Sequence, residues 1–482
     1  MSNHGERRFE IGAMMDTSGV RFGTSGARGR VVDMTDEVCF AYTAAFIQTL
    51  PPGTKRVALA IDLRPSSPVI AAACAAAIVA AGMAVDYCGA IPTPALAYFA
   101  QAQGIPGVMV TGSHIPFDRN GIKFYGMQGE ITKADEANIA AATVCLPAGP
   151  LTMTLPSAGE DAAALYLARY LGFFPSRCLA GMRLGFYEHS SVARNLLTEL
   201  LQRLGATVIS LGRTDQFVPI DTEAVAEADV LQARAWACEH RFDAILSTDG
   251  DADRPLLGDE HGNWLRGDVA GILCAQALGA QAVVTTVSCN TALELSGAFA
   301  TVRRTRIGSP YVIAGIEALI AAGEQSVVGF EPNGGFLVGT LLSGTGGVLS
   351  PLMTRDAVLP ILCLLHAARS RGVPVSALAQ GLPPRFTASD RLQNFPTETS
   401  QRLLAELAAS SPALSALLSG IGEAVALDQT DGLRVTLANG EIVHFRPSGN
   451  APELRCYAEA TTQARAGALV QLGLQRILAH AG

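Results

Sequence analysis

Residues 56–62 read RVALAID, an almost uninterrupted apolar run that predicts a buried β-strand. A helix-like stretch follows from about Ser67, and a second strand is predicted over residues 83–88. The same order of features returns at residues 182–188 (MRLGFYE), which precede a helical stretch and a further strand at 206–211. Strand, helix and strand at this spacing are typical of parallel sheets covered by helices.

A third copy of this unit is predicted to begin at residues 281–289 (QAVVTTVSC), although its helix is less distinct. The last hundred residues differ, because residues 432–445 alternate in polarity around Asn439-Gly440, a strong hairpin signal. A further strand is predicted at 455–459 and a closing helix at 464–478. We therefore expect an α/β protein with three related α/β units, built on mixed or parallel sheets, and a C-terminal α+β domain. The predicted domains are 1–160, 161–268, 269–383 and 384–482.

Composition narrows the class of protein. The chain has 482 residues, with 35 Lys and Arg against 43 Asp and Glu, so its net charge of -8 argues against a nucleic-acid partner. Its ten cysteines form no C-x-x-C pair, which predicts reduced thiols in a cytoplasmic protein. The N-terminus lacks the apolar core of a signal peptide. The uncharged run at 69–85 favours a buried helix leading into a strand over a membrane span.

Five polar, Gly-rich segments interrupt the apolar background. The first, residues 22–30 (FGTSGARGR), combines glycines that let backbone N–H groups approach an anion with the cation of Arg28. The alternative is a flexible turn with an exposed arginine. The second, residues 111–125 (TGSHIPFDRNGIKFY), follows a predicted strand and carries Ser113, His114 and Lys123. Ligands bind at this end of strands in open α/β sheets, whereas a plain polar turn is the alternative.

The third segment, residues 246–255 (LSTDGDADRP), places carboxylates on alternate residues after a predicted strand: Asp249, Asp251 and Asp253. Three carboxylates so close together repel one another unless a cation joins them, and hard oxygen ligands suit Mg²⁺. An EF-hand loop is excluded, because Arg254 stands where that loop requires glycine. A solvated acidic turn is the remaining alternative.

The fourth segment, residues 329–335 (GFEPNGG), offers Glu331 and Asn333, which could hydrogen-bond neighbouring sugar hydroxyls. The fifth, residues 446–455 (RPSGNAPELR), is rich in donors and predicts a phosphate clamp. The clamp residues are Arg446, Ser448, Gly449, Asn450 and Arg455. An ordinary turn and a hairpin end with two surface arginines are the respective alternatives.

Taken together, these segments make the chain similar to the α-D-phosphohexomutases, the superfamily of phosphomannomutase and phosphoglucomutase. The resemblance extends from about Phe22 to the C-terminal helix, and it implies four domains around a deep central cleft. It further implies a phosphorylated Ser113, flanked by His114, with Arg28 and Lys123 at the reacting hydroxyl. It implies one Mg²⁺ per active site, held by Ser113, Asp249, Asp251 and Asp253. The arginine that closes the acidic motif of the family corresponds to Arg254.

The chain departs from the family pattern at several positions. The sugar loop of the family usually reads G-E-x-S-G-H, but here Asn333 replaces the serine and Gly335 replaces the histidine. The serine loop usually reads S-H-N-P, and Ile115 replaces its asparagine. In the phosphate clamp, Asn450 and Ala451 stand in place of threonine and glutamate. The preferred sugar, and the residue that replaces the histidine at Gly335, are therefore left open.

The resemblance implies interconversion of hexose 6-phosphate and hexose 1-phosphate, of mannose or glucose, through a phosphoserine and a hexose 1,6-bisphosphate that also acts as activator. We expect Lys123 to act as the base, with its pKa lowered by neighbouring cations. The alternatives are a phosphoglucosamine or phosphoacetylglucosamine mutase, favoured by the amide of Asn333, and an inert sugar-phosphate-binding paralogue. An aspartyl phosphatase would leave Ser113 unexplained. The expected partner is a small phosphosugar, bound by a monomer or homodimer without membrane or nucleic acid.

Overall fold

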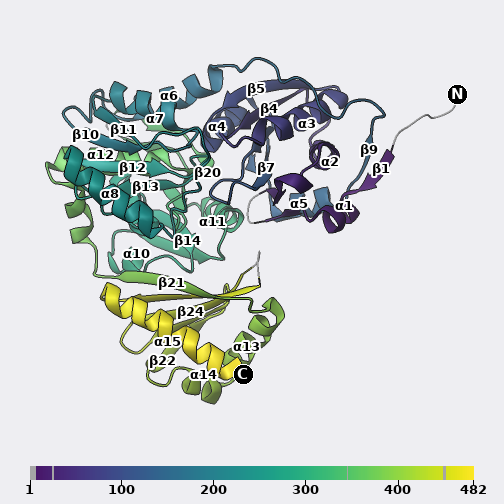
Figure 1. Ribbon diagram of the computed structural model, residues 1–482. Helices are drawn as coiled ribbons and strands as arrows, with labels where there is room; N and C mark the ends of the chain where they lie inside the picture. The colour runs from purple at the N-terminus through teal and green to yellow at the C-terminus, as the bar shows by residue number, and fades with distance from the viewer. Residues whose placement is uncertain (1–6, 24–25, 345, 449–451, 482) are drawn as a thin grey trace.

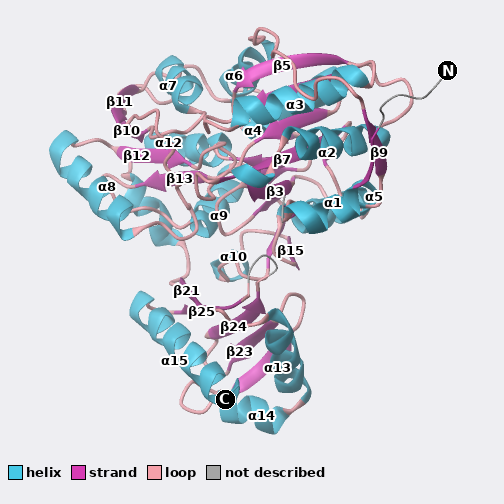
Figure 2. Cartoon of the chain, turned by 45° about the vertical axis from the view of Figure 1, so that its right-hand side comes forward, coloured by secondary structure: helices cyan, strands magenta, loops and turns pink. Residues whose placement is uncertain are grey.

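The computed structural model describes residues 7–23, 26–344, 346–448 and 452–481. Three α/β units form the upper body in Figure 1, and the C-terminal domain lies below it. Figure 2, turned by 45°, shows the same separation between the body and the C-terminal domain. The four-part α/β architecture that the sequence predicts is confirmed.

The sheets of the three α/β units share one strand order, which confirms the internal repeat. In each unit a central strand has a parallel neighbour on either side, and the strand that follows in the chain pairs antiparallel with the second neighbour. In the first unit these strands are β4 (Arg56–Ile61), β5 (Ala84–Ala90), β6 (Gly107–Val110) and β7 (Arg119–Gly126). In the second they are β10 (Arg183–Tyr187), β11 (Thr207–Leu211), β12 (Ala244–Thr248) and β13 (Pro255–Gly258). In the third they are β14 (Ala282–Thr286), β15 (Thr301–Thr305), β16 (Val327–Phe330) and β17 (Phe336–Val338).

Short strands extend two of these sheets at their edges. In the first unit, β3 (Ala27–Arg30) pairs with β7 on one side and β2 (Arg21–Phe22) on the other, and β8 (Gly129–Glu130) also pairs with β7. In the third unit, β20 (Leu352–Asp356) pairs with β17. Two small sheets lie apart: β1 (Arg7–Glu10) with β9 (Thr143–Leu146), and β18 (Leu342–Ser343) with β19 (Val348–Leu349).

Helices cover the sheets where the repeat predicts them. The Ala-rich stretch is α3 (Ser67–Ala80), which has proline in its first turn, and Gly82 at φ 77° turns the chain into β5. The equivalent helix of the third unit is the short α10 (Ala292–Leu295), which explains why its sequence signal is weak. The other helices of the body are α1 (Ile11–Ser18), α2 (Asp36–Gln48), α4 (Thr93–Gln103), α5 (Lys133–Ala140), α6 (Asp161–Phe173), α7 (Arg194–Arg203), α8 (Glu227–His240), α9 (Gly267–Ala277), α11 (Ser309–Ala321) and α12 (Val358–Arg371), with 3₁₀ turns η1 (Val31–Asp33) and η2 (Val375–Gly381).

A single apolar cluster runs through all three α/β units. It joins Met109 of the first unit, Leu184 of the second and Val283 of the third, and it continues into Leu362 of α12. The opposite face of the first sheet packs separately on α2 and α3, for example through Leu59, Phe46 and Ile78. The ends of the three central sheets are therefore held in one packed body.

The C-terminal domain has its own core. Its antiparallel sheet has the order β21 (Phe386–Gln393), β25 (Glu453–Ala460), β24 (Ile442–Pro447), β23 (Leu433–Leu437) and β22 (Ala424–Asp428). One face packs on α13 (Thr397–Ala409), α14 (Ser411–Leu417) and α15 (Gln463–Ala481). The predicted Asn439-Gly440 turn joins β23 to β24.

Polar contacts join the C-terminal domain to the third unit. Nδ2 of Asn290 donates to the carbonyl oxygen of Arg385 at 2.8 Å, and the backbone N–H of Ile307 donates to Oδ2 of Asp431 at 2.9 Å. Thr291 also hydrogen-bonds the Glu459 carboxylate.

Within the described ranges, no single helix combines the length and apolar character needed to cross a membrane. The bent pair α12 and η2 meets the criterion jointly, on length and composition alone.

Candidate active site

The repeat places three of the predicted loops at equivalent positions. Ser113 lies in the loop after β6, Asp249 begins the loop after β12, and Glu331 begins the loop after β16. Each loop connects the second parallel neighbour of the central strand to the antiparallel strand that follows. The carboxyl ends of the three sheets therefore bring the serine, acidic and sugar loops to one site.

Ser113 is held in an unusual backbone conformation. Its φ of 53° lies in the left-handed region, which is uncommon for a residue other than glycine and costs about 1–3 kcal/mol. The side chain is fully buried, and its Oγ donates to Oδ2 of Asp249 at 2.5 Å. Nδ1 of His114 lies 3.3 Å from the same Oγ. The serine hydroxyl is thus aimed at the acidic loop of the second unit.

A buried ion pair at the end of β4 holds the serine loop in this shape. Oδ2 of Asp62 accepts from Oγ1 of Thr111 at 2.7 Å, and the hydroxyl of Thr111 in turn accepts from the N–H of Ser113. The Arg64 guanidinium donates to four loop carbonyls, those of Ser113, Ile115, Pro116 and Arg119. A Cβ at Gly112 would lie 2.5 Å from Cζ of Arg64, so this position has room for glycine alone. Sequence reasoning missed both residues of the ion pair.

We predict that Arg64→Met destabilises the protein and disorders the serine loop. The substitution leaves Asp62 as an uncompensated buried charge and orphans four carbonyl groups, so the free energy of unfolding should fall by about 3–5 kcal/mol. Chemical denaturation monitored by circular dichroism measures this change. Arg56→Met is the control, because Arg56 begins β4 and is an exposed arginine that pairs with Asp86; it should change stability by less than about 1 kcal/mol. Equal stabilities of the two variants would contradict the bracing role of Arg64.

The three aspartates of the acidic loop lie close together in the interior. All three are buried, and one carboxylate oxygen from each lies within 4.8 Å of the others. Among the described residues, Oδ1 of Asp251 and Oδ1 of Asp253 have no hydrogen-bond partner. Burial, together with the charges of Asp251 and Asp253, raises the pKa of Asp249 well above its ordinary value. Buried, crowded carboxylates with free oxygens fit a hard divalent cation.

Lys123 contacts the same carboxylates. It lies on β7, and its Nζ donates to Oδ2 of Asp251 and to Oδ2 of Asp253, each at 2.7 Å. Burial alone would lower the pKa of Lys123, but the two carboxylates outweigh burial and hold the pKa above its ordinary value. The expectation of a lowered lysine pKa is therefore wrong for this arrangement, because the nearest partners of the amine are anions.

Cations crowd around His114. The charge of Arg254, then burial, then the charge of Arg28 lower the pKa of His114, so its imidazole is neutral. Burial and the charges of Arg254 and Arg355 lower the pKa of Arg28 to about 10. Arg28 lies on β3, where its register partner is Gly121 of β7, so the structure places it on a strand and not in a flexible turn. Mutual repulsion among these cations favours binding of an anion.

The sugar loop lies against an arginine that sequence reasoning missed. NH1 of Arg355, on β20, donates to Oε1 of Glu331 at 3.0 Å. Oδ1 of Asn333 accepts from the N–H of Gly335 at 2.9 Å, and its backbone carbonyl accepts from Oγ1 of Thr222 at 2.8 Å. The amide oxygen of Asn333 thus closes its own loop, which weakens its assignment as the acceptor of an N-acetyl group.

The predicted phosphate clamp lies on the polar face of the C-terminal sheet. Arg446 of β24 is the register partner of Arg455 of β25, whose partner on the other side is Arg391 of β21. Like charges directly opposite one another destabilise a sheet, so a row of three arginines favours a bound anion. Asp431 partly offsets the row by accepting from Nε of Arg446 at 2.9 Å.

The remaining clamp residues are only partly described. Ser448 is buried, and its N–H donates to the carbonyl oxygen of Glu453 at 2.8 Å. The predicted ligands Gly449 and Asn450 lie outside the described residues. Glu223 of the second unit lines a small cavity together with His444 and Tyr457 of the C-terminal domain, which places it between the body and that domain.

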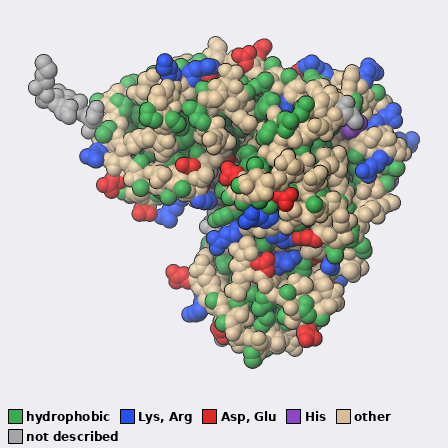
Figure 3. Space-filling model, turned by 180° about the vertical axis from the view of Figure 1, so that it is seen from behind, with side chains coloured by type: hydrophobic (Ala, Val, Ile, Leu, Met, Phe, Trp, Pro, Cys, Tyr) green, Lys and Arg blue, Asp and Glu red, His purple; other side chains and the backbone are tan. Residues whose placement is uncertain are grey.

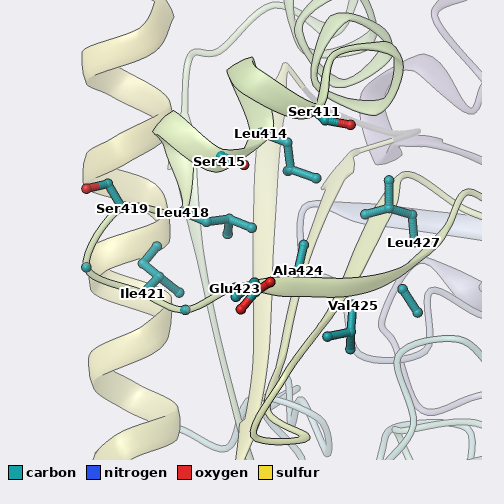
Figure 4. Close-up of a pocket in the computed structure, with 13 residues that line it drawn as sticks. Ser411, Leu414, Ser415, Leu418, Ser419, Ile421, Glu423, Ala424, Val425 and Leu427 are labelled. Carbon is teal, nitrogen blue, oxygen red and sulfur yellow. The ribbon is translucent and has the colours of Figure 1, made fainter.

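The surface is hollowed between the body and the C-terminal domain, and Lys and Arg side chains gather there in Figure 3. A separate groove lies between α14 and β22, where Figure 4 shows Leu414, Leu418 and Val425 along its walls. Within the described ranges, no predicted site residue lines this second groove.

Comparison with known proteins places the chain in a class of phosphotransfer enzymes. Models of the phosphoglucomutase/phosphomannomutase α/β/α domains I, II and III match residues 19–144, 168–262 and 266–386, and the model of the C-terminal domain of these enzymes matches 392–472. The chain belongs to the phosphoglucomutase/phosphomannomutase family.

Two relatives and one solved structure illustrate the membership. A phosphomannomutase of Salmonella muenchen is 47% identical over 472 residues, which cover 97% of this chain and 98% of that relative. A phosphomannomutase of Sinorhizobium fredii is 45% identical over 467 residues, which cover 95% of this chain and 98% of that relative. A phosphoglucomutase/phosphomannomutase family protein of Burkholderia thailandensis has the same fold, with a TM-score of 0.74 at 21% identity over 95% of this chain and 97% of that one.

Proposed function

We propose that the protein interconverts hexose 6-phosphate and hexose 1-phosphate, of mannose or glucose, through phospho-Ser113 and a hexose 1,6-bisphosphate. The observation that carries the proposal is the buried Ser113 hydroxyl, which lies 2.5 Å from Asp249 at the meeting point of three equivalent loops. An inert binding protein has no need of a strained serine aimed at buried carboxylates. The division into domains at residues 160, 268 and 383 belongs to the same proposal.

The reaction has two halves. In the first, the bond between phosphorus and Oγ of phospho-Ser113 breaks, a free hydroxyl of the hexose monophosphate forms the new bond to phosphorus, and the proton that this hydroxyl loses is balanced by the proton that Oγ gains. In the second, the bond between the other phosphorus and its sugar oxygen breaks, Oγ gives up its proton and bonds that phosphorus, and the freed sugar oxygen gains a proton. Arg28 and Lys123 supply positive charge beside the transferring group, and His114 contacts Oγ as a neutral side chain. Lys123 acts in this proposal as a cation, since its ion pairs keep it protonated.

Asp249, Asp251 and Asp253 would hold the metal ion, for which we propose Mg²⁺, together with an oxygen of phospho-Ser113. When bound, the metal would neutralise charge on the phosphoryl oxygens. Arg254 directly precedes β13 and faces the same cluster, with Nε 3.6 Å from Oδ1 of Asp253. We assign it to the phosphate of the sugar.

The sugar and its second phosphate lie between the body and the C-terminal domain in this proposal. Glu331 accepts hydrogen bonds from sugar hydroxyls, and Asn333 shapes the loop that presents it. Arg446, Ser448, Gly449, Asn450 and Arg455 bind the phosphate that does not react. All residues proposed to bind the phosphosugar, in the body and in the C-terminal domain, belong to one chain. The site would therefore be complete in a monomer or in each subunit of a homodimer.

A substrate panel tests the function. Mannose 1-phosphate, glucose 1-phosphate, glucosamine 1-phosphate and N-acetylglucosamine 1-phosphate are each supplied with Mg²⁺ and a trace of the matching bisphosphate, and formation of the 6-phosphate is followed by ³¹P NMR. We expect the mannose or glucose compound to have a kcat/KM at least about tenfold above the amino sugars, because one unsatisfied polar group in a site costs over 1 kcal/mol. Turnover confined to an amino sugar would favour the alternative mutases, and absence of turnover would favour the inert paralogue.

A further inference from the structure

Arg355 joins two loops that carry different parts of the proposed site. Its side chain is buried, with 3% of its surface exposed. Its Nε and NH2 donate to Oδ2 of Asp253 at 3.2 and 2.7 Å, while its NH1 donates to Oε1 of Glu331 at 3.0 Å. One planar guanidinium therefore fixes a carboxylate of the acidic loop and the carboxylate of the sugar loop at once.

The stem of the same arginine fills the space over Gly335. A Cβ on Gly335 would lie 2.5 Å from Cδ and 2.9 Å from Cβ of Arg355, closer than side-chain carbons approach one another. The backbone of Gly335 does not adopt the left-handed conformation. The glycine is required at this position by space and not by backbone conformation, and the arginine occupies the room that a larger residue at 335 would need.

The strand that carries Arg355 is firmly anchored. The neighbouring carboxylate of Asp356 accepts from the hydroxyls of Tyr166 and Tyr170 and from the N–H of Val358. Asp356 is also the register partner of Phe336, which follows Gly335 directly. The position of the Arg355 backbone relative to the sugar loop is thus fixed from both sides.

We infer that Arg355 is a positioning residue that sets the Glu331 carboxylate for the sugar and couples the sugar loop to the metal loop, and that Gly335 is the space reserved for it. The inference rests on the proposed function. Arg355 contacts Asp253, which is proposed to bind Mg²⁺, and Glu331, which is proposed to bind the sugar. The affinity for the hexose phosphate and the affinity for Mg²⁺ should therefore depend on one another through this side chain. Coupling of this kind is reciprocal, so either ligand can report it.

The first test removes the guanidinium group of Arg355. Binding of mannose 1-phosphate and glucose 1-phosphate is measured by isothermal titration calorimetry on the full chain, in EDTA and in Mg²⁺. Arg355→Met should weaken phosphosugar binding by about thirtyfold or more, as expected when one partner of a buried charge network is lost. It should also reduce the difference between the phosphosugar affinity measured in Mg²⁺ and that measured in EDTA. Arg355→Lys should bind the phosphosugar more tightly than Arg355→Met does, because lysine keeps the positive charge although it lacks the planar guanidinium and its several donors. Arg203→Met, an exposed helix position, is the matched control.

The second test displaces Arg355 without removing it, by adding a methyl group at Gly335. Gly335→Ala alone should weaken binding by a factor similar to that of Arg355→Ala, because the new methyl group displaces the arginine. In the double variant the alanine should cost little more than Arg355→Ala alone, a non-additivity that a double-mutant cycle measures. Gly381→Ala, where an added Cβ meets open space, should change nothing.

The outcomes separate the inference from the proposed function. Additive effects in the cycle, or unchanged phosphosugar affinity in Arg355→Met, would overturn the positioning role while the parent enzyme still turned over its substrate. A parent protein that neither binds nor converts the hexose phosphates would instead overturn the proposed function.

Discussion

Ser113→Ala should abolish phosphohexose interconversion, with a loss in kcat on the order of 10⁴-fold or more. The hydroxyl oxygen is the atom that carries the phosphoryl group, and alanine removes it while leaving the loop braced by Arg64. Because Arg64 contacts carbonyl groups and not the serine hydroxyl, we expect the variant to keep its stability within about 1 kcal/mol. The loss should therefore be chemical and not structural.

One measurement, with a matched control variant, tests this outcome. Intact-protein mass spectrometry after incubation with a hexose 1,6-bisphosphate should show a phosphoryl adduct on the parent and on Ser411→Ala, an exposed serine in the C-terminal domain, but not on Ser113→Ala. A phosphorylated and active Ser113→Ala variant would mean that another side chain receives the phosphate.

Asp251→Asn should weaken the affinity for Mg²⁺ by about 100-fold or more and lower activity with it, an effect at least as large as that of losing an outer-shell partner. The substitution preserves shape, but it removes a full charge from a cluster in which one oxygen of Asp251 has no partner. Asp251 also accepts from Oγ1 of Thr93 at 2.5 Å and from Lys123, so the amide must reorient and the lysine loses half of its compensation. Residual activity should need much higher Mg²⁺.

Calorimetric titration of the metal alone measures the effect without depending on catalysis, and titration of activity with Mg²⁺ measures it in the working enzyme. Asp215→Asn, an exposed aspartate paired with Arg194, serves as the control for removing one negative charge. Equal Mg²⁺ affinities for parent and Asp251→Asn would place the metal elsewhere, and the acidic triad would then need another explanation.

The sequence predicts the repeat and the strands because those signals are local. The strand at 56–62, the helix from Ser67 and the Asn439-Gly440 hairpin are each determined by residues close together in the chain, and the structure confirms all three. The meeting of the serine, acidic and sugar loops also follows from local order, since each loop trails the same strand of the repeat.

What the sequence could not reveal is which side chains meet across units. Arg355 lies 20 residues beyond the sugar loop in a segment without a motif, and its partners Asp253 and Glu331 come from two different units. Lys123 was expected among cations because Arg28 is a neighbour in the family pattern, but its nearest partners prove to be carboxylates. Asp62 is the last residue of the first predicted strand, and a carboxylate that ends an apolar strand needs a buried partner. Of the features that were missed, the Asp62–Arg64 ion pair is therefore the one that the sequence could have indicated.

The separate core of the C-terminal domain has a consequence for the order of events in catalysis. If the reaction passes through a bisphosphate, as proposed, that molecule must rotate end over end to give up each phosphate in turn, which requires one of its two binding sites to release it. The serine, the triad and Glu331 rise from a body with one continuous core, so loosening them would cost packing energy throughout that body. The arginine row stands on a domain joined to the body by polar contacts, and such a junction can act as a hinge whose opening leaves both cores intact. The C-terminal domain, which is proposed to bind the phosphate that does not react, would thus be the part that moves. The phosphoryl transfer would take place on the body, which stays rigid.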